Sequence, residues 1–399
     1  MGRNNWLIRN VTVYGETKVF ERGYVRIKDG KIDEIGEESE LTNRYNSGEE
    51  ETRFEEGFIC VPGFIDVHIH GAAGADVMDA TPEALRTIAS SLPAEGTTSF
   101  LATTMTLGRE SIEKALVNAG RYRETQEEAG SAEMLGIHLE GPFLSPEKAG
   151  AQPIEHIIEP DVALFERWQH ESGGCIRLVT LAPERNGGLS LIRHLAAHDI
   201  VASIGHSKAT YEEAVDGAKA GATHVTHLFN GMSGLHHREP GVAGAALLRK
   251  ELTAELIVDG IHSRPEIIEL AYRMKGKDGL VLITDSMRAK CLKNGTYDLG
   301  GQTVVVENGQ ARLANGRLAG SVLKMKDALR NLIHFTGCSI AEAVQMGSLN
   351  PARQLKISDR KGSLAPGKDA DMVILDDSMQ IVMTLCRGEV AYDRERDLQ

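Results

Sequence analysis

Eight short apolar runs, alternating with helical stretches from residue 63 onward, constrain the fold of this chain more than any other feature. Runs of this length that alternate with amphipathic helices are typical of parallel strands joined by crossover helices. Eight such repeats over roughly 290 residues predict a (β/α)8 barrel. A doubly wound sheet is the alternative, but no glycine-rich phosphate fingerprint follows the first strand. The expected strands are 64–70, 98–103, 134–140, 176–181, 201–206, 224–229, 255–259 and 280–285.

Helices are expected between most of these runs and again after the last one. One interval, 291–320, instead contains short β-like pieces separated by Asn-Gly and Gly-Gly pairs. Such pairs between alternating runs predict an excursion of β-hairpins. The expected helices are 82–95, 111–128, 189–198, 211–220, 265–273, 321–336 and 340–347.

Both ends of the chain have β character. Residues 1–62 alternate and turn often, with a polar interruption at 38–53 that we expect to be loop or short helix. Residues 367–375 and 381–390 return to the β pattern. The predicted fold is therefore α/β, with a catalytic (β/α)8 TIM-type barrel at 63–354 and a small β-sandwich domain built from both termini, 1–62 and 355–399.

Composition narrows the class of partner. The chain has 399 residues and a net charge of −13, from 44 Lys and Arg against 57 Asp and Glu. That balance disfavours nucleic acid, although a local cationic pocket could still bind a small anion. The five cysteines are scattered, and we see no apolar run of the length that a membrane crossing needs. We therefore expect a cytoplasmic protein that binds neither nucleic acid nor membrane.

The first expected strand carries the segment FIDVHIHG at 64–71. Side chains alternate along a strand, so Asp66, His68 and His70 share one face while the apolar residues between them share the other. Two imidazoles at one strand end offer neutral nitrogen ligands to a divalent metal. The alternative is a strand with two ordinary histidines, and the other strand ends decide between the two interpretations.

Metal-compatible side chains recur at other strand ends, and the active sites of barrels lie where the C-terminal ends of the strands meet. His138 lies one layer deeper than Glu140, so a hydrogen-bonded role in the core is expected for it. His224 lies three residues before His227 and faces the other side of its strand, which indicates a structural role. The candidate ligand set is His68, His70, Glu140, His206 and His227, with Asp285 beside it.

The same segments carry a resemblance to a known family. They are PGFIDVHIHG at 62–71, HLEGPF at 138–143, GHS at 205–207, THLFNGM at 226–232, REPG at 238–241, DGIH at 259–262 and TD at 284–285. With them the chain resembles the amidohydrolase superfamily nearly from end to end, and within it the N-acetylglucosamine-6-phosphate deacetylase family. The closing GSLAPGKDAD at 362–371 is shared by many amidohydrolases and does not indicate a substrate.

By this resemblance, the chain would bind two divalent metals. Many amidohydrolases bridge two metals with a carboxylated lysine on the fourth strand, but that strand has no lysine here, so Glu140 would supply the bridging carboxylate. His206 and His227 would join it at one metal, and His68 and His70 at the other. Histidine and carboxylate ligands suit Zn²⁺ or Fe²⁺, with Mn²⁺ and Co²⁺ also compatible.

The resemblance also implies hydrolysis of N-acetyl-D-glucosamine 6-phosphate to D-glucosamine 6-phosphate and acetate by a metal-activated water, in amino-sugar catabolism. Asp285 would be the catalytic acid and base. Gln152 departs from the histidine that some members carry there, and Arg238 would reach the site of a neighbouring subunit, which implies a homodimer. The expected substrate contacts are Asn230, Gly231, Arg238, His262 and Gln152.

Two other functions stay open at this point. Another amidohydrolase, such as an N-acetylgalactosamine-6-phosphate deacetylase or a cyclic amidase, would keep the metal ligands and change the pocket contacts. A non-catalytic scaffold would keep only the fold, and the complete ligand set together with Asp285 argues against it.

Overall fold

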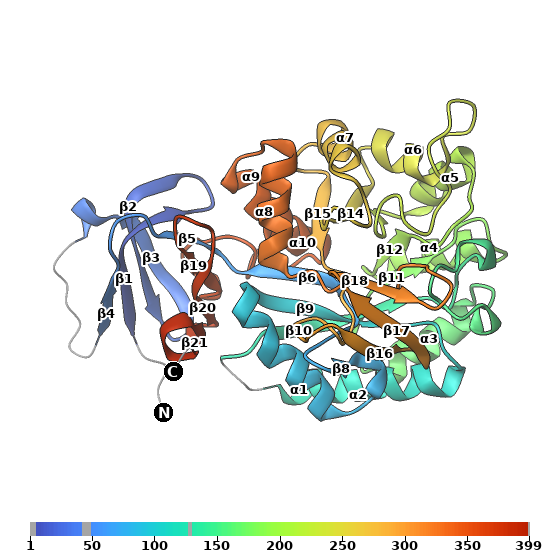
Figure 1. The fold of residues 1–399 in the computed structure, drawn as a ribbon, viewed down its shortest axis with the longest axis horizontal. Helices are drawn as coiled ribbons and strands as arrows, with labels where there is room; N and C mark the ends of the chain where they lie inside the picture. Colours follow the sequence, from blue (N-terminus) through green and yellow to red (C-terminus); the bar gives the residue numbers. More distant parts are fainter. Residues whose placement is uncertain (1–4, 42–48, 127–129, 398–399) are drawn as a thin grey trace.

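The computed structural model describes residues 5–41, 49–126 and 130–397, and its central feature is a parallel sheet of eight strands (Figure 1). Neighbouring strands follow the order β15-β14-β13-β12-β11-β10-β9-β6. The ring closes between the two outer strands, where the Asp285 N–H donates to the His68 carbonyl (2.9 Å) and the His70 N–H to the Ser286 carbonyl (2.9 Å). The strands are β6 (Phe64–Ile69), β9 (Thr97–Thr104), β10 (Glu133–Glu140), β11 (Ile176–Leu181), β12 (Val201–Ile204), β13 (His224–Val225), β14 (Thr253–Ile257) and β15 (Leu280–Ile283). The predicted (β/α)8 barrel is confirmed.

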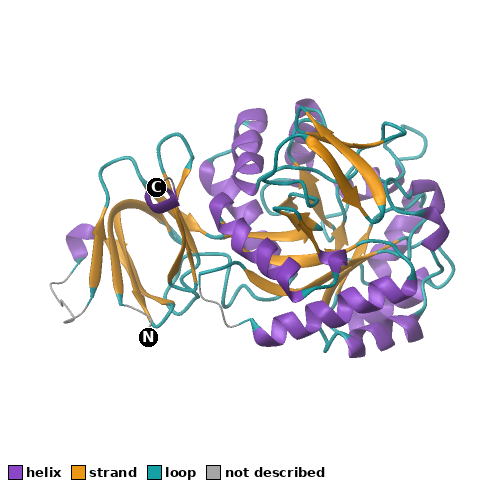
Figure 2. Cartoon of the chain, turned by 60° about the horizontal axis from the view of Figure 1, so that its bottom comes forward, coloured by secondary structure: helices purple, strands orange, loops and turns teal. Residues whose placement is uncertain are grey.

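Helices surround the barrel on its outside (Figure 2). They are α1 (Pro82–Ser91), α2 (Arg109–Thr125), α3 (Val162–Glu171), α4 (Gly188–Ala197), α5 (Tyr211–Ala220), α6 (Gly241–Leu248), α7 (Pro265–Lys275), α8 (Met325–Thr336), α9 (Ile340–Gly347) and α10 (Leu349–Gln354). Single 3₁₀ turns are η1 (Glu38–Glu40), η2 (Val77–Asp79), η3 (Leu92–Glu95), η4 (Pro146–Lys148) and η5 (Ile154–His156). None of the helices in the described ranges combines the length and apolar character that a bilayer crossing needs.

Several expected helices differ from the structure at their ends, and the one expected over 82–95 is α-helical only to Ser91 and continues as η3. The helix expected over 321–336 begins only at Met325, because the Ser321 N–H donates to the Asp285 carbonyl (2.7 Å) and holds this segment extended beside β15. The helix expected over 111–128 begins earlier, at Arg109, and ends at Thr125, while residues 127–129 lie outside the described residues.

The strands of the two chain ends form one curled sheet beside the barrel (Figure 1). β5 from the N-terminal part pairs antiparallel with β19 from the C-terminal part, and this pair joins the two halves. The sheet curves around its own apolar core, so the small β-sandwich predicted from both termini is confirmed. Its strands are β1 (Trp6–Tyr14), β2 (Val19–Lys28), β3 (Lys31–Glu37), β4 (Glu50–Arg53), β5 (Ile59–Pro62), β19 (Met372–Leu375), β20 (Ile381–Cys386) and β21 (Glu389–Asp393), followed by α11 (Arg394–Asp397).

The expectation of loop or short helix over 38–53 was wrong at its C-terminal end, where β4 forms. β5 pairs with β1 only at Thr12 and Val13, which leaves the first half of that edge of β1 open. β4 fills it in parallel, and the Trp6 indole N–H donates to Thr52 Oγ1 (3.0 Å). Backbone pairing therefore decides the structure of a segment whose polar side chains gave no strand signal. Residues 42–48 lie outside the described residues.

The predicted hairpin excursion is a three-stranded antiparallel sheet, which we call the flap: β16 (Gly295–Leu299), β17 (Gln302–Glu307) and β18 (Gln310–Leu313). The short pair β7 (Gly71–Ala72) and β8 (Ala75–Asp76) follows the first barrel strand. Apolar side chains of the flap, among them Leu299 and Val304, pack on Met105 and Met287 from the loops that follow barrel strands. The flap therefore lies at the C-terminal end of the barrel.

A buried cluster of charges joins the barrel to the terminal sheet. Lys361 is 1% exposed, and its Nζ lies 2.9 Å from Glu133 at the start of β10 and 3.1 Å from Asp369 before β19; it also pairs with Asp371. Burial alone would raise the pKa of Glu133, but the hydrogen bond from Arg360 and the charge of Lys361 lower it to about 2. Each carboxylate of the cluster therefore depends on the central lysine.

We expect Lys361→Met to lower the free energy of unfolding by about 3–5 kcal/mol, because buried Asp371 loses the cation that pairs with it and Glu133 and Asp369 are left with Arg360 and more distant cations. Urea denaturation at neutral pH measures this loss. Lys356→Met is the control, because Lys356 pairs with Asp199 on the exposed surface and its loss should change little. Equal stability of Lys361→Met and the unmodified protein would contradict the proposed role of the cluster.

Acid should weaken the same cluster in the unmodified protein. The pKa of Glu133 lies below its ordinary value of 4.5 in the folded state, so its stabilising contribution is complete above pH 4.5 and is lost as the pH falls toward 2.

Candidate active site

The six side chains singled out from the sequence meet at the C-terminal end of the barrel. His68 lies within β6 and His70 directly after it, and Glu140 is the last residue of β10. His206, His227 and Asp285 each lie two residues beyond the end of a strand, after β12, β13 and β15. All six are buried. The barrel thus places residues that are far apart in sequence in one small volume.

Three of the six leave their strands in a left-handed backbone conformation. The φ angles are 47° at His206, 30° at His227 and 47° at Asp285. Side chains with a Cβ rarely adopt positive φ, and such strain is found preferentially at functional sites. The strands expected over 201–206, 224–229 and 280–285 were therefore too long, because the extended backbone stops before these residues.

The Glu140 carboxylate is the centre of the cluster. Its Oε1 lies 3.1 Å from His227 Nε2 and 3.2 Å from His206 Nε2, and its Oε2 lies 3.2 Å from His70 Nε2. His68 Nε2 lies 3.4 Å from Oε1. A single carboxylate therefore contacts four imidazoles that come from three different strands.

Asp285, which follows β15, contacts two of these imidazoles, those of His68 and His70. Its Oδ1 lies 3.4 Å from His70 Nε2 and 3.5 Å from His68 Nε2. The ligand atoms fall into two groups, His68, His70 and Asp285 in one and Glu140, His206 and His227 in the other, each with all its atoms within 4.8 Å of one another.

The electrostatics of the cluster are set by opposite charges at close range. Burial alone would raise the pKa of Glu140, but the charge of His68 and the hydrogen bonds from His206 and His227 hold it well below its ordinary value. Burial alone would lower the pKa of His70, but its hydrogen bonds to Asp285 and Glu140 raise it to about 10. The carboxylates therefore stay ionised and attract positive charge.

The nitrogen atoms of this cluster fit a divalent metal. His206 Nδ1 donates to the Lys148 carbonyl (2.8 Å), so in the neutral ring its Nε2 carries the lone pair, and this Nε2 lies only 3.0 Å from His227 Nε2. His68 Nε2 is buried without a hydrogen-bond partner. Imidazole nitrogens that converge beside ionised carboxylates are a donor set that could hold a divalent metal.

Four of the five expected substrate contacts line a cavity of about 260 Å³ over this cluster: Gln152, Asn230, Gly231 and His262. Gln152 donates through Nε2 to Glu140 Oε2 (2.8 Å) and accepts from the Thr106 N–H (2.8 Å). Its amide therefore touches the central carboxylate directly.

His262 is held by Asp259, whose Oδ2 lies 2.6 Å from His262 Nδ1. Burial alone would lower the pKa of His262, but the hydrogen bond and charge of Asp259 outweigh burial, and the pKa is raised. This contact leaves Nε2 as the ring nitrogen available to the cavity.

Arg238 is the fifth expected contact, and it does not line the cavity of its own chain. It is exposed in the loop between β13 and α6, where its guanidinium lies 2.8 Å from His237 Nε2. Arg317, which follows the flap, does line the cavity and donates to the Gly150 carbonyl (3.3 Å). The sequence reasoning missed Arg317, because nothing local to a glycine-rich hairpin shows that it folds back over the barrel.

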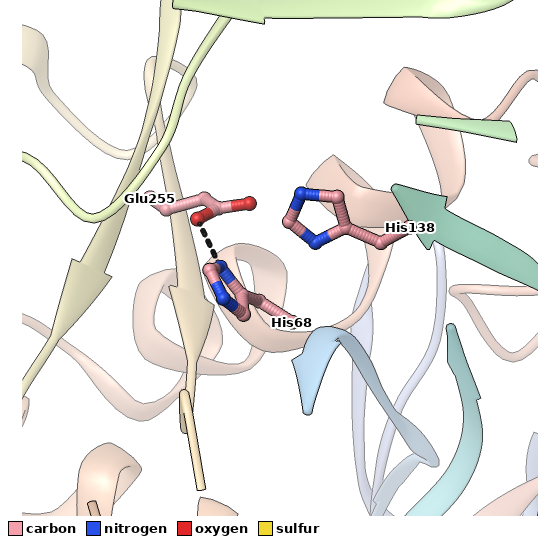
Figure 3. Close-up of side chains that lie close together, drawn as sticks. All are labelled: His68, His138 and Glu255. Atoms are coloured by element: carbon pink, nitrogen blue, oxygen red, sulfur yellow. Dashed lines mark hydrogen bonds and ion pairs between the residues drawn. The ribbon is translucent and has the colours of Figure 1, made fainter. Parts of the chain in front are cut away.

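Glu255 was also missed. The strand expected over 255–259 is β14, Thr253–Ile257, so the prediction placed Glu255 at a strand end when it lies in the strand centre. There it is fully buried and hydrogen-bonds His68 (Figure 3). A single carboxylate inside an otherwise apolar run was the available signal.

Comparison with known proteins adds to this geometry. A model of the amidohydrolase family matches residues 59–391. The N-acetylglucosamine-6-phosphate deacetylase of Bacillus subtilis (strain 168) is 49% identical over 387 residues, which cover 97% of each chain. The N-acetylgalactosamine-6-phosphate deacetylase of Escherichia coli O157:H7 is 41% identical over 333 residues, which cover 84% of this chain and 88% of that protein.

The fold is also similar to a solved structure, a variant of the N-acetyl-D-glucosamine-6-phosphate deacetylase from Mycobacterium smegmatis in complex with N-acetyl-D-glucosamine-6-phosphate. The TM-score is 0.90 at 31% sequence identity, and the match covers 97% of this chain and 99% of that one.

Proposed function

The chain belongs to the amidohydrolase family, and from that premise we propose that it hydrolyses N-acetyl-D-glucosamine 6-phosphate to D-glucosamine 6-phosphate and acetate, a step of amino-sugar catabolism. The observation that carries the proposal is the 49% identity, over 97% of both chains, to a deacetylase named for this substrate. The convergence of the six strand-end side chains supports it from the structure, because amide hydrolysis needs them together.

We propose that the cluster holds two divalent metals, Zn²⁺ or Fe²⁺, with Mn²⁺ and Co²⁺ also suited to these ligands. Glu140, His206 and His227 would hold one, and His68 and His70 would hold the other together with Glu140. When bound, such metals lower the pKa of water and polarise a carbonyl oxygen. The unpartnered Nε2 of His68 and the facing Nε2 atoms of His206 and His227 support this assignment.

Asp285 is the group that moves the proton. Its Oδ1 faces the two histidines of β6, beside the place where water must attack. There it takes the proton of the attacking water and then gives it to the amide nitrogen, so that the amine leaves neutral. His262, held by Asp259, offers Nε2 to the acetyl oxygen as negative charge develops on it.

The sugar phosphate occupies the outer part of the cavity in this proposal. Asn230 and Gly231 follow the strand of His227 and offer an amide side chain and backbone. Arg317 lines the cavity from the same chain, and Arg238 would reach it from the neighbouring subunit of a homodimer. Arg238 is exposed in its own chain, and among the described residues its guanidinium has no carboxylate partner. It is therefore free to pair with a phosphate, which a guanidinium binds well, and this supports the arrangement.

A cytoplasmic location is part of the proposal. All five cysteines are free, and four of them are buried, as expected for a protein of a reducing compartment.

Acetate release from the purified protein tests the function directly. Turnover should be highest on N-acetyl-D-glucosamine 6-phosphate, lower on the galacto epimer, and lowest on N-acetylglucosamine without phosphate. A preference for the galacto epimer would favour the function named for the Escherichia coli relative. No acetate release from any of the three sugars by the metal-loaded protein would contradict the proposal.

Substituting His68 with Gln and His70 with Asn should lower the metal content by about one ion per chain while the fold persists, because the second ligand group stays intact. Elemental analysis of the purified variant measures this content, and circular dichroism checks the fold. A single ion per active unmodified chain would contradict the two-metal proposal.

Asp285→Asn should lower kcat on the order of 10²–10⁴-fold and leave metal content and substrate binding nearly unchanged, because the lost step is proton transfer. Steady-state kinetics and elemental analysis on the same preparation separate the two effects. If the variant kept nearly normal kcat, another group would be the base.

Arg238→Ala should raise KM for the phosphosugar far more than it lowers kcat, because a phosphate contact far from the scissile bond is similar in the ground and transition states. A desolvated arginine–phosphate pair is worth about 2–5 kcal/mol by analogy with interfacial charge pairs. Turnover of unphosphorylated N-acetylglucosamine should hardly change. An equal loss on both sugars would remove the phosphate role.

Mixing Arg238→Ala with Asp285→Asn subunits tests whether the arginine crosses between subunits. A mixed dimer would hold one site with both defects and one site with neither, so activity should reappear from two poor variants. Failure to recover activity despite confirmed subunit exchange would place Arg238 outside a shared site.

A further inference from the structure

We propose that Glu255 is a positioning residue that holds two of the metal ligands, His68 and His227, in the conformation that binding requires. This inference rests on the proposed metal site. Glu255 lies at the centre of β14, is fully buried, and touches neither the cavity nor the central carboxylate. It therefore acts through the ligands and not on the substrate.

Three donors share the Glu255 carboxylate. Oε2 accepts from His68 Nδ1 (2.9 Å) and from the backbone N–H of His227 (3.0 Å), and Oε1 accepts from His224 Nε2 (3.2 Å). Figure 3 shows the first of these contacts, with His68 and Glu255 reaching each other from different strands. One side chain thus connects β6, β13 and β14 below the cluster.

The contact with His68 fixes which ring nitrogen can bind a metal. A carboxylate accepts hydrogen bonds, so His68 Nδ1 carries a proton, and in the neutral ring that binds a metal the lone pair is on Nε2. That Nε2 is buried and has no hydrogen-bond partner among the described residues, and it faces Glu140 at 3.4 Å and Asp285 at 3.5 Å. Metal-binding histidines are oriented in this way by a hydrogen bond at the other nitrogen.

The contact with His227 supports a strained turn. His227 has a φ of 30°, and the two N–H groups of this turn both find acceptors on β14: the His227 N–H on the Glu255 side chain and the Leu228 N–H on the Glu255 carbonyl (2.9 Å). A strained backbone conformation persists only where surrounding contacts hold it in place. Glu255 supplies such contacts at His227, which belongs to the ligand group of Glu140 and His206.

A third metal held by His68, His138 and Glu255 is a competing interpretation, because their ligand atoms lie within 4.8 Å of one another. The contacts argue against it. His138 Nε2 lies 2.7 Å from Thr180 Oγ1, its Nδ1 lies 3.4 Å from Thr103 Oγ1, and the oxygens of Glu255 already accept three hydrogen bonds. These three residues form a hydrogen-bonded layer beneath the ligands.

Glu255→Gln tests the proposal, because Gln keeps the shape and loses one acceptor and the charge. We expect the affinity for the metal held by His68 to fall about 10–100-fold, as is typical when a partner of a ligating histidine is lost. Zn²⁺ or Co²⁺ titration against a competing chelator measures this affinity. Added metal should restore kcat, which a defect of folding alone would not allow.

A second readout follows the ligand itself. In the Zn²⁺-loaded protein, the ¹⁵N shifts of the His68 ring should show Nδ1–H with Nε2 bound to the metal in the unmodified chain, and a mixture of ring states in Glu255→Gln. His224→Gln is the matched control, since an amide N–H can still reach Oε1 and His68 keeps its partner; its metal affinity should stay within about twofold of the unmodified value.

The outcomes separate the possible failures. Normal metal affinity in a less stable Glu255→Gln would mean that Glu255 only stabilises the core, and the positioning role would be wrong. Should Glu255→Gln fail to fold, Glu255→Asp keeps the charge, withdraws the carboxylate by one methylene, and must weaken the same metal. If the His68 and His70 double variant keeps its full metal content, the proposed metal site itself fails. A loss of a third ion in Glu255→Gln would favour the competing interpretation.

Discussion

The site depends on one interaction, the burial of the Glu140 carboxylate among four imidazoles. An ionised carboxylate taken out of water is destabilising unless positive charge or hydrogen-bond donors surround it. Each imidazole contacts Glu140 from a strand or strand end whose position the barrel fixes. The cluster therefore forms when the eight strands close into the barrel. A divalent cation, when bound among these ligands, balances the charge of the carboxylates, so binding and folding would support each other.

The backbone shows how the barrel serves this centre. Side chains at the end of a parallel strand point alternately into and out of the barrel. This alternation alone does not fix the direction of a metal-ligating side chain closely. At His206, His227 and Asp285 the chain instead turns to positive φ, and hydrogen bonds hold each turn in place. The His206 carbonyl accepts from the Ser145 N–H of a loop, the Leu228 N–H donates to the Glu255 carbonyl of β14, and the Asp285 N–H donates to the His68 carbonyl of β6.

Sequence patterns predicted what is locally encoded and missed what is decided by tertiary contact. The helix expected over 211–220 agrees with the structure, and a capping box of Thr210 and Glu213, encoded locally in the chain, fixes its start. The ends of the strands expected over 201–206, 224–229, 255–259 and 280–285 were placed too late, because the expected runs extended into segments where the backbone has already left the extended conformation. Glu255 escaped notice for the same reason: a shift of two residues in β14 hid the fact that a carboxylate lies at a strand centre. Arg317 depends on how the flap folds back, which no local pattern contains.

The charge distribution links the cluster to the proposed substrate. The chain carries a net charge of −13, and the catalytic centre itself contains two carboxylates, so a phosphorylated sugar meets an unfavourable field unless cations stand at the far end of the cavity. Within its own chain the cavity has Arg317 at its rim, while Arg238 lies outside on an exposed loop. A phosphate dianion is held best by more than one charge-assisted donor. In the proposed mechanism, the cations that would hold the phosphate lie apart from Glu140 and Asp285, so neither group would neutralise the other, and a second subunit that supplied Arg238 would extend that separation.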